Sequence, residues 1–244
     1  MIRDFNAERE CENLIDWIRE YFKNQSSAKG AVIGISGGKD SSVTAKLLVE
    51  ALGKERVFGV LMPNGEQKDI SDSLKLVDIL GINYKIVNLK KSYNGLLEAI
   101  ADEKLSADAK INISPRLRMT TLYAIGANMN YRVCGTGNKS EGFVGYTTKW
   151  GDNAFDFNPV GDLTTEEVVA VGDFLGLPYE LVHKTPSDGL SGKSDEEKLG
   201  FSYKQINEFI ENGSCGNKEI DEKISLKHEY NEHKRNLPPK YKRE

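Results

Sequence analysis

The sequence has few cysteines, and their positions favour no metal ribbon and no disulfide framework. Cys11, Cys134 and Cys215 are odd in number and widely separated, and no C-x-x-C pair is present. Small secreted domains and zinc modules place cysteines in pairs at short, regular spacings. The pattern is therefore typical of ordinary thiols in a reducing compartment, and we expect a cytoplasmic protein.

Long apolar runs and an excess of basic residues are also absent. No segment approaches the roughly 20 apolar residues of a membrane-spanning helix, and residues 1–5 lack the apolar stretch of a signal peptide. The net charge of −4 differs from the basic excess expected of a general nucleic-acid binder. We therefore expect no membrane and no nucleic-acid partner.

Short apolar runs alternate with amphipathic segments along the first half of the chain. Helices are predicted at 14–22, 43–52 and 71–80, and buried strands at 31–35, 57–61, 84–88 and 132–135. Strands that alternate with helices in this way indicate an α/β fold. We expect a doubly wound, mainly parallel sheet with helices on both faces.

The second half contains helix starts and one long polar segment. Ser114 and Pro115 predict an N-cap and first helical residue, and residues 164–167 and 202–205 predict capping boxes. Residues 186–200 are polar and lack apolar periodicity, which is typical of a linker or a functional loop. We interpret residues 1–244 as one domain with a mobile lid at 186–200.

The loop at residues 34–41 carries the clearest chemical signal. It lies between a predicted strand and a predicted helix, where open parallel sheets bind ligands, and its glycines and helix N–H groups suit a phosphate. The Asp40 carboxylate repels phosphate unless a cation lies between them, which predicts Mg²⁺. A turn that merely needs glycines is the alternative, but Ser36 and Ser41 in register favour a phosphate site. We expect Lys39 to be solvated at the edge of this loop.

Residues 36–41 resemble the S-G-G-x-D-S signature of the N-type ATP pyrophosphatases, which split ATP into AMP and pyrophosphate on an adenine nucleotide alpha hydrolase-like fold. The Walker pattern G-x-x-x-x-G-K-[ST] is absent. Several activities share the signature, including NAD synthetases and tRNA-modifying enzymes. The resemblance implies that ATP binds at Gly34, Ile35, Ser36, Gly37, Gly38, Lys39, Asp40 and Ser41.

Four further segments, at 115–126, 135–152, 156–159 and 232–235, resemble the ammonia-dependent NAD synthetase family. The resemblance implies ATP-dependent amidation of deamido-NAD with ammonia through an acyl-adenylate, with release of AMP and pyrophosphate. It also implies Mg²⁺ and a homodimer. Arg116 and Arg118 support an anionic substrate, because cations are disfavoured at a helix N-terminus.

The resemblance extends to individual residues. It implies ATP contacts at Gln67, Thr136 and Ser187, where Ser187 stands at a position usually occupied by threonine. It places Mg²⁺ at Asp40 and Glu141, and a catalytic aspartate near the ammonia site at Asp152. The residues implied for deamido-NAD are Arg116, Lys149, Asp156, His233 and Lys234.

The chain departs from the family pattern at two positions. Leu61 stands where the family has an arginine near ATP, and Thr165 stands where it has a lysine near the phosphates. Compensation by Lys139, Lys184 or Lys193 is one possibility. A nucleotide-binding sensor without catalysis is therefore an alternative, and another ATP pyrophosphatase, such as a tRNA-modifying enzyme, is a second.

Overall fold

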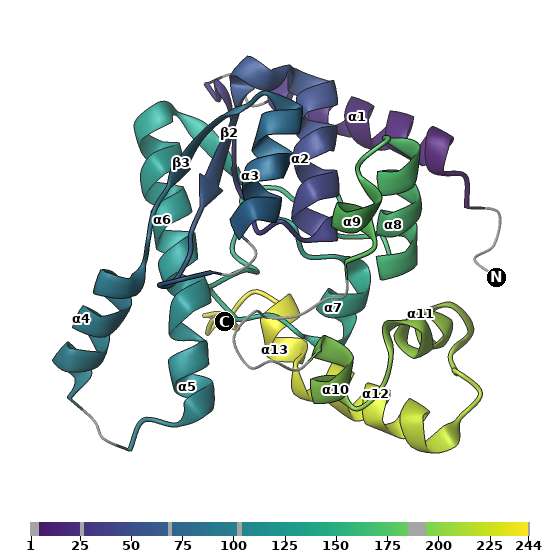
Figure 1. Ribbon diagram of the computed structural model, residues 1–244. Helices are drawn as coiled ribbons and strands as arrows, with labels where there is room; N and C mark the ends of the chain where they lie inside the picture. Colours follow the sequence, from purple (N-terminus) through teal and green to yellow (C-terminus); the bar gives the residue numbers. More distant parts are fainter. Residues whose placement is uncertain (1–4, 25–26, 68–69, 102–103, 185–193, 244) are drawn as a thin grey trace.

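A parallel sheet lies between two layers of helices in the computed structural model, which describes residues 5–24, 27–67, 70–101, 104–184 and 194–243 (Figure 1). Within these residues the sheet has four strands in the order β3-β2-β1-β4, and every neighbouring pair is parallel. The strands are β1 (Gly30–Gly34), β2 (Val57–Leu61), β3 (Asn83–Ile86) and β4 (Tyr131–Cys134). The doubly wound α/β prediction is confirmed.

The alternating side chains of the central strand build a core on each face of the sheet. Ala31 and Ile33 of β1 join a cluster with the first helical layer, whereas Val32 joins a cluster with the second. Because both faces are covered, the strand reads as a continuous apolar run. The first layer comprises α1 (Ala7–Asn24), α2 (Lys39–Leu52), α3 (Ile70–Leu80), α8 (Thr165–Phe174) and α9 (Tyr179–Val182), with η1 (Lys54–Arg56) leading into β2. The second comprises α4 (Lys90–Ile100), α5 (Ala107–Ile111) and α6 (Ile113–Met129).

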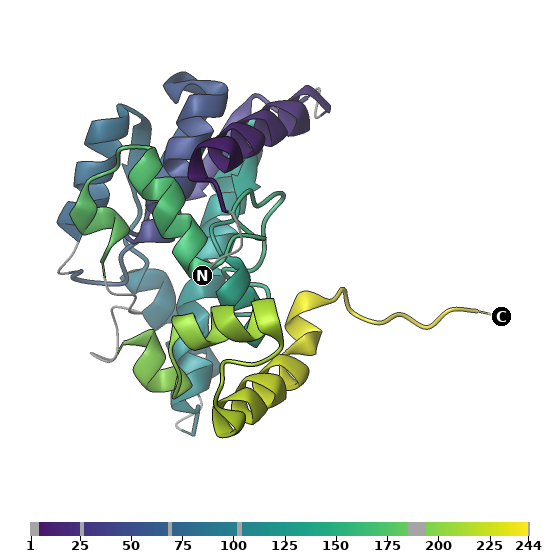
Figure 2. The ribbon, with the colours of Figure 1, turned by 90° about the vertical axis from the view of Figure 1, so that its right-hand side faces the viewer.

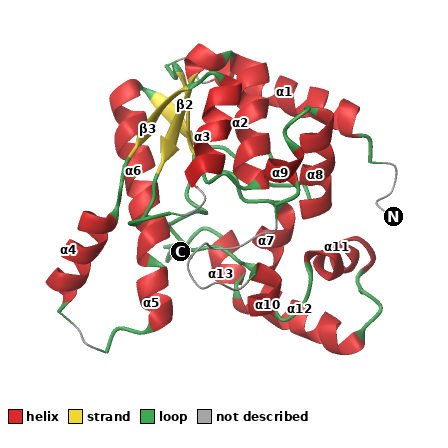
Figure 3. Cartoon of the chain, viewed as in Figure 1, coloured by secondary structure: helices red, strands yellow, loops and turns green. Residues whose placement is uncertain are grey.

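The remaining helices form a third group with its own small core. Val144, Leu199, Ile206 and Ile224 are buried against one another. Figures 1 and 3 show this group below the sheet, on the side toward which the β2 arrow points. Its members are α7 (Lys139–Val144), α10 (Asp195–Leu199), α11 (Tyr203–Asn212), α12 (Lys218–Tyr230) and α13 (Glu232–Arg235). No helix in the described part of the chain is long and apolar enough to cross a membrane.

The predicted helix start at Ser114 and Pro115 is wrong. Helix α6 already begins at Ile113, because α5 ends at Ile111 and the two helices follow each other with Asn112 between them. Ser114 is buried, and its hydroxyl accepts a hydrogen bond from Asn64 Nδ2 at 3.0 Å. Both predicted capping boxes are confirmed, at Thr164 for α8 and at Ser202 for α11.

The predicted lid is ordered over its last part. Residues 195–199 form α10, which Ser194 and Glu197 start with a capping box, and Leu199 is buried in the third core. The expectation of a segment without structure is wrong here, because the same S-x-x-E signal that starts other helices is present in the sequence. Residues 186–193 lie outside the described residues, so the lid remains a prediction there.

Candidate functional site

The site lies where the chain order of the sheet reverses. From β1 the chain passes to β2 on one side, while β4 pairs with β1 on the other. The loops that leave the carboxyl ends of β1 and β4 therefore border one crevice, which is where doubly wound proteins bind ligands. A hydrogen bond of 2.9 Å from Asn138 Nδ2 to Asp40 Oδ1 joins the two loops.

The loop after β1 has the geometry of an anion site. Gly37 has φ +77°, and a Cβ atom there would lie 2.8 Å from Asp72 Cβ, so this position requires glycine. The hydroxyls of Ser36 and Ser41 lie 2.9 Å apart. Helix α2 follows with Gly38 as its N-cap and no side-chain capping bond, which leaves its first N–H groups available to an anion.

The carboxylates of Asp40 and Glu141 lie close enough to interact electrostatically. Glu141 Oε2 accepts a hydrogen bond of 3.2 Å from the Asn138 backbone N–H, within the capping box that starts α7. Burial, and then the negative charge of Asp40, raise the pKa of Glu141. The positive charge of Lys39 acts in the opposite direction and lowers the pKa of Glu141, but the net shift is upward.

The prediction that Lys39 is solvated is wrong. Its side chain is only 5% exposed, and Nζ lies 2.8 Å from Asp40 Oδ2 and 5.7 Å from the Tyr203 ring centre. Burial alone lowers the pKa of Lys39, but the carboxylates of Asp40, Glu141 and Asp195 outweigh it, and the net pKa is raised. The Tyr203 ring at the start of α11 comes from a segment more than 160 positions away, so this neighbour of Lys39 cannot be inferred from the local sequence.

The two departures from the family pattern are both buried. Leu61 ends β2 in the core, and the Thr165 backbone N–H donates to Ser140 Oγ at 3.0 Å. Of the proposed compensating lysines, Lys139 pairs with Asp162 at 2.9 Å, and both residues line a separate cavity described below. Lys184 pairs with Asp72 at 2.6 Å, and Lys193 lies outside the described residues. Lys39 is a buried cation beside Asp40.

Most residues implied for deamido-NAD lie together. Arg116 Nε donates to the Lys149 carbonyl oxygen at 3.3 Å, and Lys149 Nζ donates to the carbonyl oxygen of His233. Lys234 Nζ donates to the carbonyl oxygens of Gly145 and Thr147 at 2.7 and 2.8 Å. The start of α6, the loop after α7 and the short helix α13 thus form one cationic group.

The two aspartates implied near the substrate make different contacts. Asp152 Oδ1 accepts from the Thr148 backbone N–H at 2.8 Å, and burial raises the pKa of Asp152. Asp156 contacts other elements, accepting from the Val133 backbone N–H at 2.8 Å and from the Tyr123 hydroxyl at 3.2 Å.

The remaining residues implied for ATP follow the strand ends. Thr136 comes directly after β4, and Gln67 lies in the loop between β2 and α3. Ser187 lies outside the described residues. The positions of Thr136 and Gln67 are consistent with the crevice, because the carboxyl ends of parallel strands meet at one edge.

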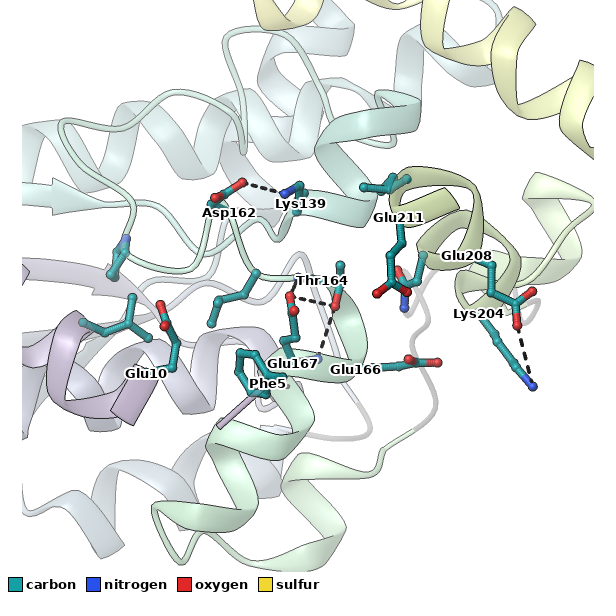
Figure 4. Close-up of a pocket in the computed structure, with 15 residues that line it drawn as sticks. Phe5, Glu10, Lys139, Asp162, Thr164, Glu166, Glu167, Lys204, Glu208 and Glu211 are labelled. Carbon is teal, nitrogen blue, oxygen red and sulfur yellow. Dashed lines mark hydrogen bonds and ion pairs between the residues drawn. The ribbon is translucent and has the colours of Figure 1, made fainter. Parts of the chain in front are cut away.

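A separate cavity of about 430 Å³ lies between α1, α7, α8 and α11. Figure 4 shows its acidic lining and the ion pair of Lys139 with Asp162. None of the predicted site residues lines it, and glutamates outnumber lysines on its wall. An acidic wall disfavours a polyphosphate.

Asn138 was not predicted as a site residue from the sequence, although it contacts the loop that contains Asp40. It is 2% exposed and contacts Asp40 in the first turn of α2, Glu141 of α7 and Thr165 of α8. Its N-x-x-E spacing to Glu141 is a readable helix start. The contact with Asp40, 98 positions away, is not readable from the local sequence.

Fold and loop define the class of protein: an α/β protein with an anion-binding loop at the switch point of a parallel sheet. The family model for NAD synthase matches residues 10–242. An NH(3)-dependent NAD(+) synthetase of Carboxydothermus hydrogenoformans is 38% identical over 238 residues, covering 96% of this chain and 97% of that protein. The chain therefore belongs to the NAD synthase family.

Two solved structures are similar over nearly the whole chain. An NMN synthetase from Francisella tularensis has a TM-score of 0.90 and 33% identity, covering 98% of this chain and 99% of that one. An NH3-dependent NAD synthetase from Campylobacter jejuni has a TM-score of 0.83 and 30% identity, covering 98% and 100%. The family match selects NAD synthesis among the activities that share the loop signature.

Proposed function

We propose that this protein uses ATP to convert the nicotinate carboxylate of deamido-NAD into the amide of NAD, with ammonia as the nitrogen donor. The observation that carries the proposal is the joining of the loop 36–41 to the loop 135–141 by the Asn138–Asp40 hydrogen bond. That contact brings a phosphate-binding turn and a second carboxylate to one crevice. The curated relatives act as NH(3)-dependent NAD(+) synthetases by name.

The reaction proceeds in two steps. The nicotinate carboxylate attacks the α-phosphorus of ATP, pyrophosphate leaves, and an acyl-adenylate forms. Ammonia then attacks the acyl carbon, AMP leaves, and one proton is released. Ser36, Ser41 and the first N–H groups of α2 hold the departing pyrophosphate, where fixed donors stabilise developing charge.

Mg²⁺ fits this donor set. Asp40 and Glu141 offer carboxylate oxygens, and a cation beside them would favour the charged form of Glu141, whose pKa burial and then Asp40 raise. The described residues contain no group of three or more potential metal-ligating side chains, and Asp40 and Glu141 would hold Mg²⁺ together with phosphate oxygens and water. Bound Mg²⁺ neutralises phosphate charge during transfer.

The cationic group of Arg116, Lys149 and Lys234 is assigned to the anionic dinucleotide, together with His233 and Asp156. Lys234 lies within electrostatic reach of Asp152, and burial lowers the pKa of Lys234. Asp152 is assigned as the proton acceptor beside the ammonia site, because its raised pKa brings it closer to the working pH.

The function is tested by product analysis. Purified protein with ATP, Mg²⁺, deamido-NAD and ammonium should release AMP, pyrophosphate and NAD in equal amounts. A nucleotide-binding sensor would bind ATP without releasing pyrophosphate. ADP as the stoichiometric product would contradict the assignment of the loop.

A second candidate product is NMN. The observation that favours it is the TM-score of 0.90 with the Francisella tularensis NMN synthetase. The same carboxylate-to-amide conversion on the mononucleotide needs the same loop. Comparing kcat/KM for deamido-NAD and for nicotinate mononucleotide under identical conditions decides between the two substrates.

A cytoplasmic homodimer is part of the proposal. The three cysteines are free thiols, as expected in a reducing compartment.

The proposed homodimer rests on the C-terminal segment. Figure 2 shows the segment after α13 extending away from the helices, and its Leu237 and Tyr241 are 87% and 91% exposed. Such an arm is suited to packing on a second copy of the chain. Light scattering coupled to size-exclusion chromatography measures the assembly, and a monomer at working concentration contradicts it.

A further inference from the structure

Asn138 contacts both carboxylates of the proposed nucleotide site, that of Asp40 through its side chain and that of Glu141 through its backbone N–H. Asn138 Nδ2 donates to Asp40 Oδ1 at 2.9 Å, and Asn138 Oδ1 accepts from the Glu141 backbone N–H at 3.0 Å. The Asn138 backbone N–H in turn donates to Glu141 Oε2 at 3.2 Å. Asn138 thus contacts both residues with a single, fixed side chain.

The amide has no freedom to move away from this arrangement. Asn138 is 2% exposed, and its Oδ1 also lies 3.5 Å from Thr165 Oγ1. Thr165 is tied through its backbone N–H to Ser140, whose hydroxyl donates to Asn207 Oδ1 at 2.5 Å. The Asn138 side chain thus has hydrogen-bond partners in α2, α7 and α8, which together set its orientation.

We propose that Asn138 is a positioning residue that sets the separation and orientation of Asp40 and Glu141 for the cation that accompanies ATP. This inference rests on the proposed function, because it takes the two carboxylates as the cation ligands. Hydrogen bonds to metal-ligating carboxylates fix their direction, and losing such a bond costs roughly 10- to 100-fold in metal affinity. The Asp40 loop and the Glu141 helix come from different strands, so no local hydrogen bond of either element can replace this one.

Two substitutions distinguish the role of Asn138 as a helix cap from its role in positioning Asp40. Ser and Asp are as good as Asn at a helix N-cap, so Asn138→Ser and Asn138→Asp keep the acceptor for Glu141 N–H. Neither has the amide N–H₂ that reaches Asp40, and Asp adds a like charge beside it. The matched control is Asn217→Ser at the exposed N-cap of α12, where the Asn217 side chain accepts from Glu219 and Ile220.

The test measures protein-bound Mn²⁺ by water-proton relaxation, with the α,β-methylene analogue of ATP present, alongside the melting temperature. We expect Asn138→Ser and Asn217→Ser to melt within a few degrees of the unsubstituted protein. Mn²⁺ affinity should fall roughly 10- to 100-fold in Asn138→Ser, further in Asn138→Asp, and not in Asn217→Ser. At high Mg²⁺ concentration the kcat of Asn138→Ser should return to that of the unsubstituted protein. The Mg²⁺ concentration that gives half of the maximal rate should stay higher than in the unsubstituted protein.

Unchanged Mn²⁺ affinity in Asn138→Ser, with binding intact in the unsubstituted protein, overturns the positioning role and leaves the proposed function standing. Loss of the melting transition in Asn138→Ser together with a folded Asn138→Asp that binds Mn²⁺ normally also overturns it. Failure of the unsubstituted protein to bind Mn²⁺ with nucleotide overturns the cation site itself, and the role of Asn138 with it.

Discussion

The ammonium of Lys39 lies 2.8 Å from the carboxylate of Asp40, in a side chain that is only 5% exposed. Adjacent residues of one helical turn thus form a buried ion pair beside the phosphate loop. The pair makes Lys39 part of the folded core of the site, although the loop signature tolerates many residues at its position.

Lys39→Gln should therefore destabilise the protein. Removing one partner of a buried ion pair leaves the other charge uncompensated, which costs about 3–5 kcal/mol. Urea unfolding measures the free energy of unfolding, and Lys39→Arg, which retains the charge, should lose less. Lys23→Gln is the control, because its pair with Glu20 is exposed and worth at most about 1 kcal/mol. Equal stabilities for Lys39→Gln and Lys23→Gln would contradict this interpretation.

Gly37→Ala should disrupt the phosphate loop. Its φ of +77° strains any side chain, and the new Cβ would lie 2.8 Å from Asp72 Cβ and 2.9 Å from the Ser73 backbone nitrogen. Strain of about 1–2 kcal/mol adds to overpacking of about 1–3 kcal/mol. Gly176→Ala isolates the strain, because Gly176 has φ +67° and no atom within 4 Å of its Cβ position. The difference in unfolding free energy between the two variants measures the clash, and no difference would exclude it.

Ser41→Ala should impair catalysis strongly. The Ser41 hydroxyl lies 2.9 Å from that of Ser36 in the proposed pyrophosphate loop and donates to the Gly38 carbonyl oxygen at 3.1 Å. Loss of one donor to developing charge costs roughly 100-fold in kcat. Initial rates of pyrophosphate release measure the effect. Ser42→Ala is the control: the Ser42 hydroxyl donates to the Gly38 carbonyl oxygen at 2.8 Å within the helix, and its loss should leave the rate within a few-fold.

Ammonium should support turnover, and glutamine alone should not. Releasing ammonia from glutamine needs a thiolate or an equivalent nucleophile. Burial raises the pKa of Cys11 to about 11 and raises the pKa of Cys134 well above its ordinary value, so both thiols stay protonated. Rates with ammonium chloride and with ammonia-free glutamine test the point. Comparable rates from the two donors would contradict it.

The stability of the ligand-free protein should fall as pH rises above the ordinary carboxyl range. The pKa of Glu141 is raised from 4.5 in the folded state, chiefly by burial and then by Asp40. Between the two pKa values the folded state holds a proton that the unfolded state has lost, so stability decreases until pH passes the folded-state pKa. Urea unfolding at a series of pH values measures this slope. Glu141→Gln should reduce the slope, and an unchanged slope would assign it to other groups.

The strands and the loop could be predicted because their signals are local. An apolar run such as 57–61 needs only its own residues to indicate a buried strand, and β2 spans the same residues. The glycines and serines of 36–41 likewise define a turn before a helix. Local patterns fail where two elements meet, as at Ser114, where the preceding helix moves the start of α6.

The sequence by itself determined the α/β class, the phosphate loop and the family resemblance, since each depends on the order of residues along one segment. Only the tertiary structure decided that Lys39 is buried under Tyr203 and that Asn138 reaches Asp40. It also brought Arg116 to Lys149 and His233. These contacts depend on how α2, α7, α11 and α13 pack, because close packing over distant segments, rather than local spacing, determines which charges share a site.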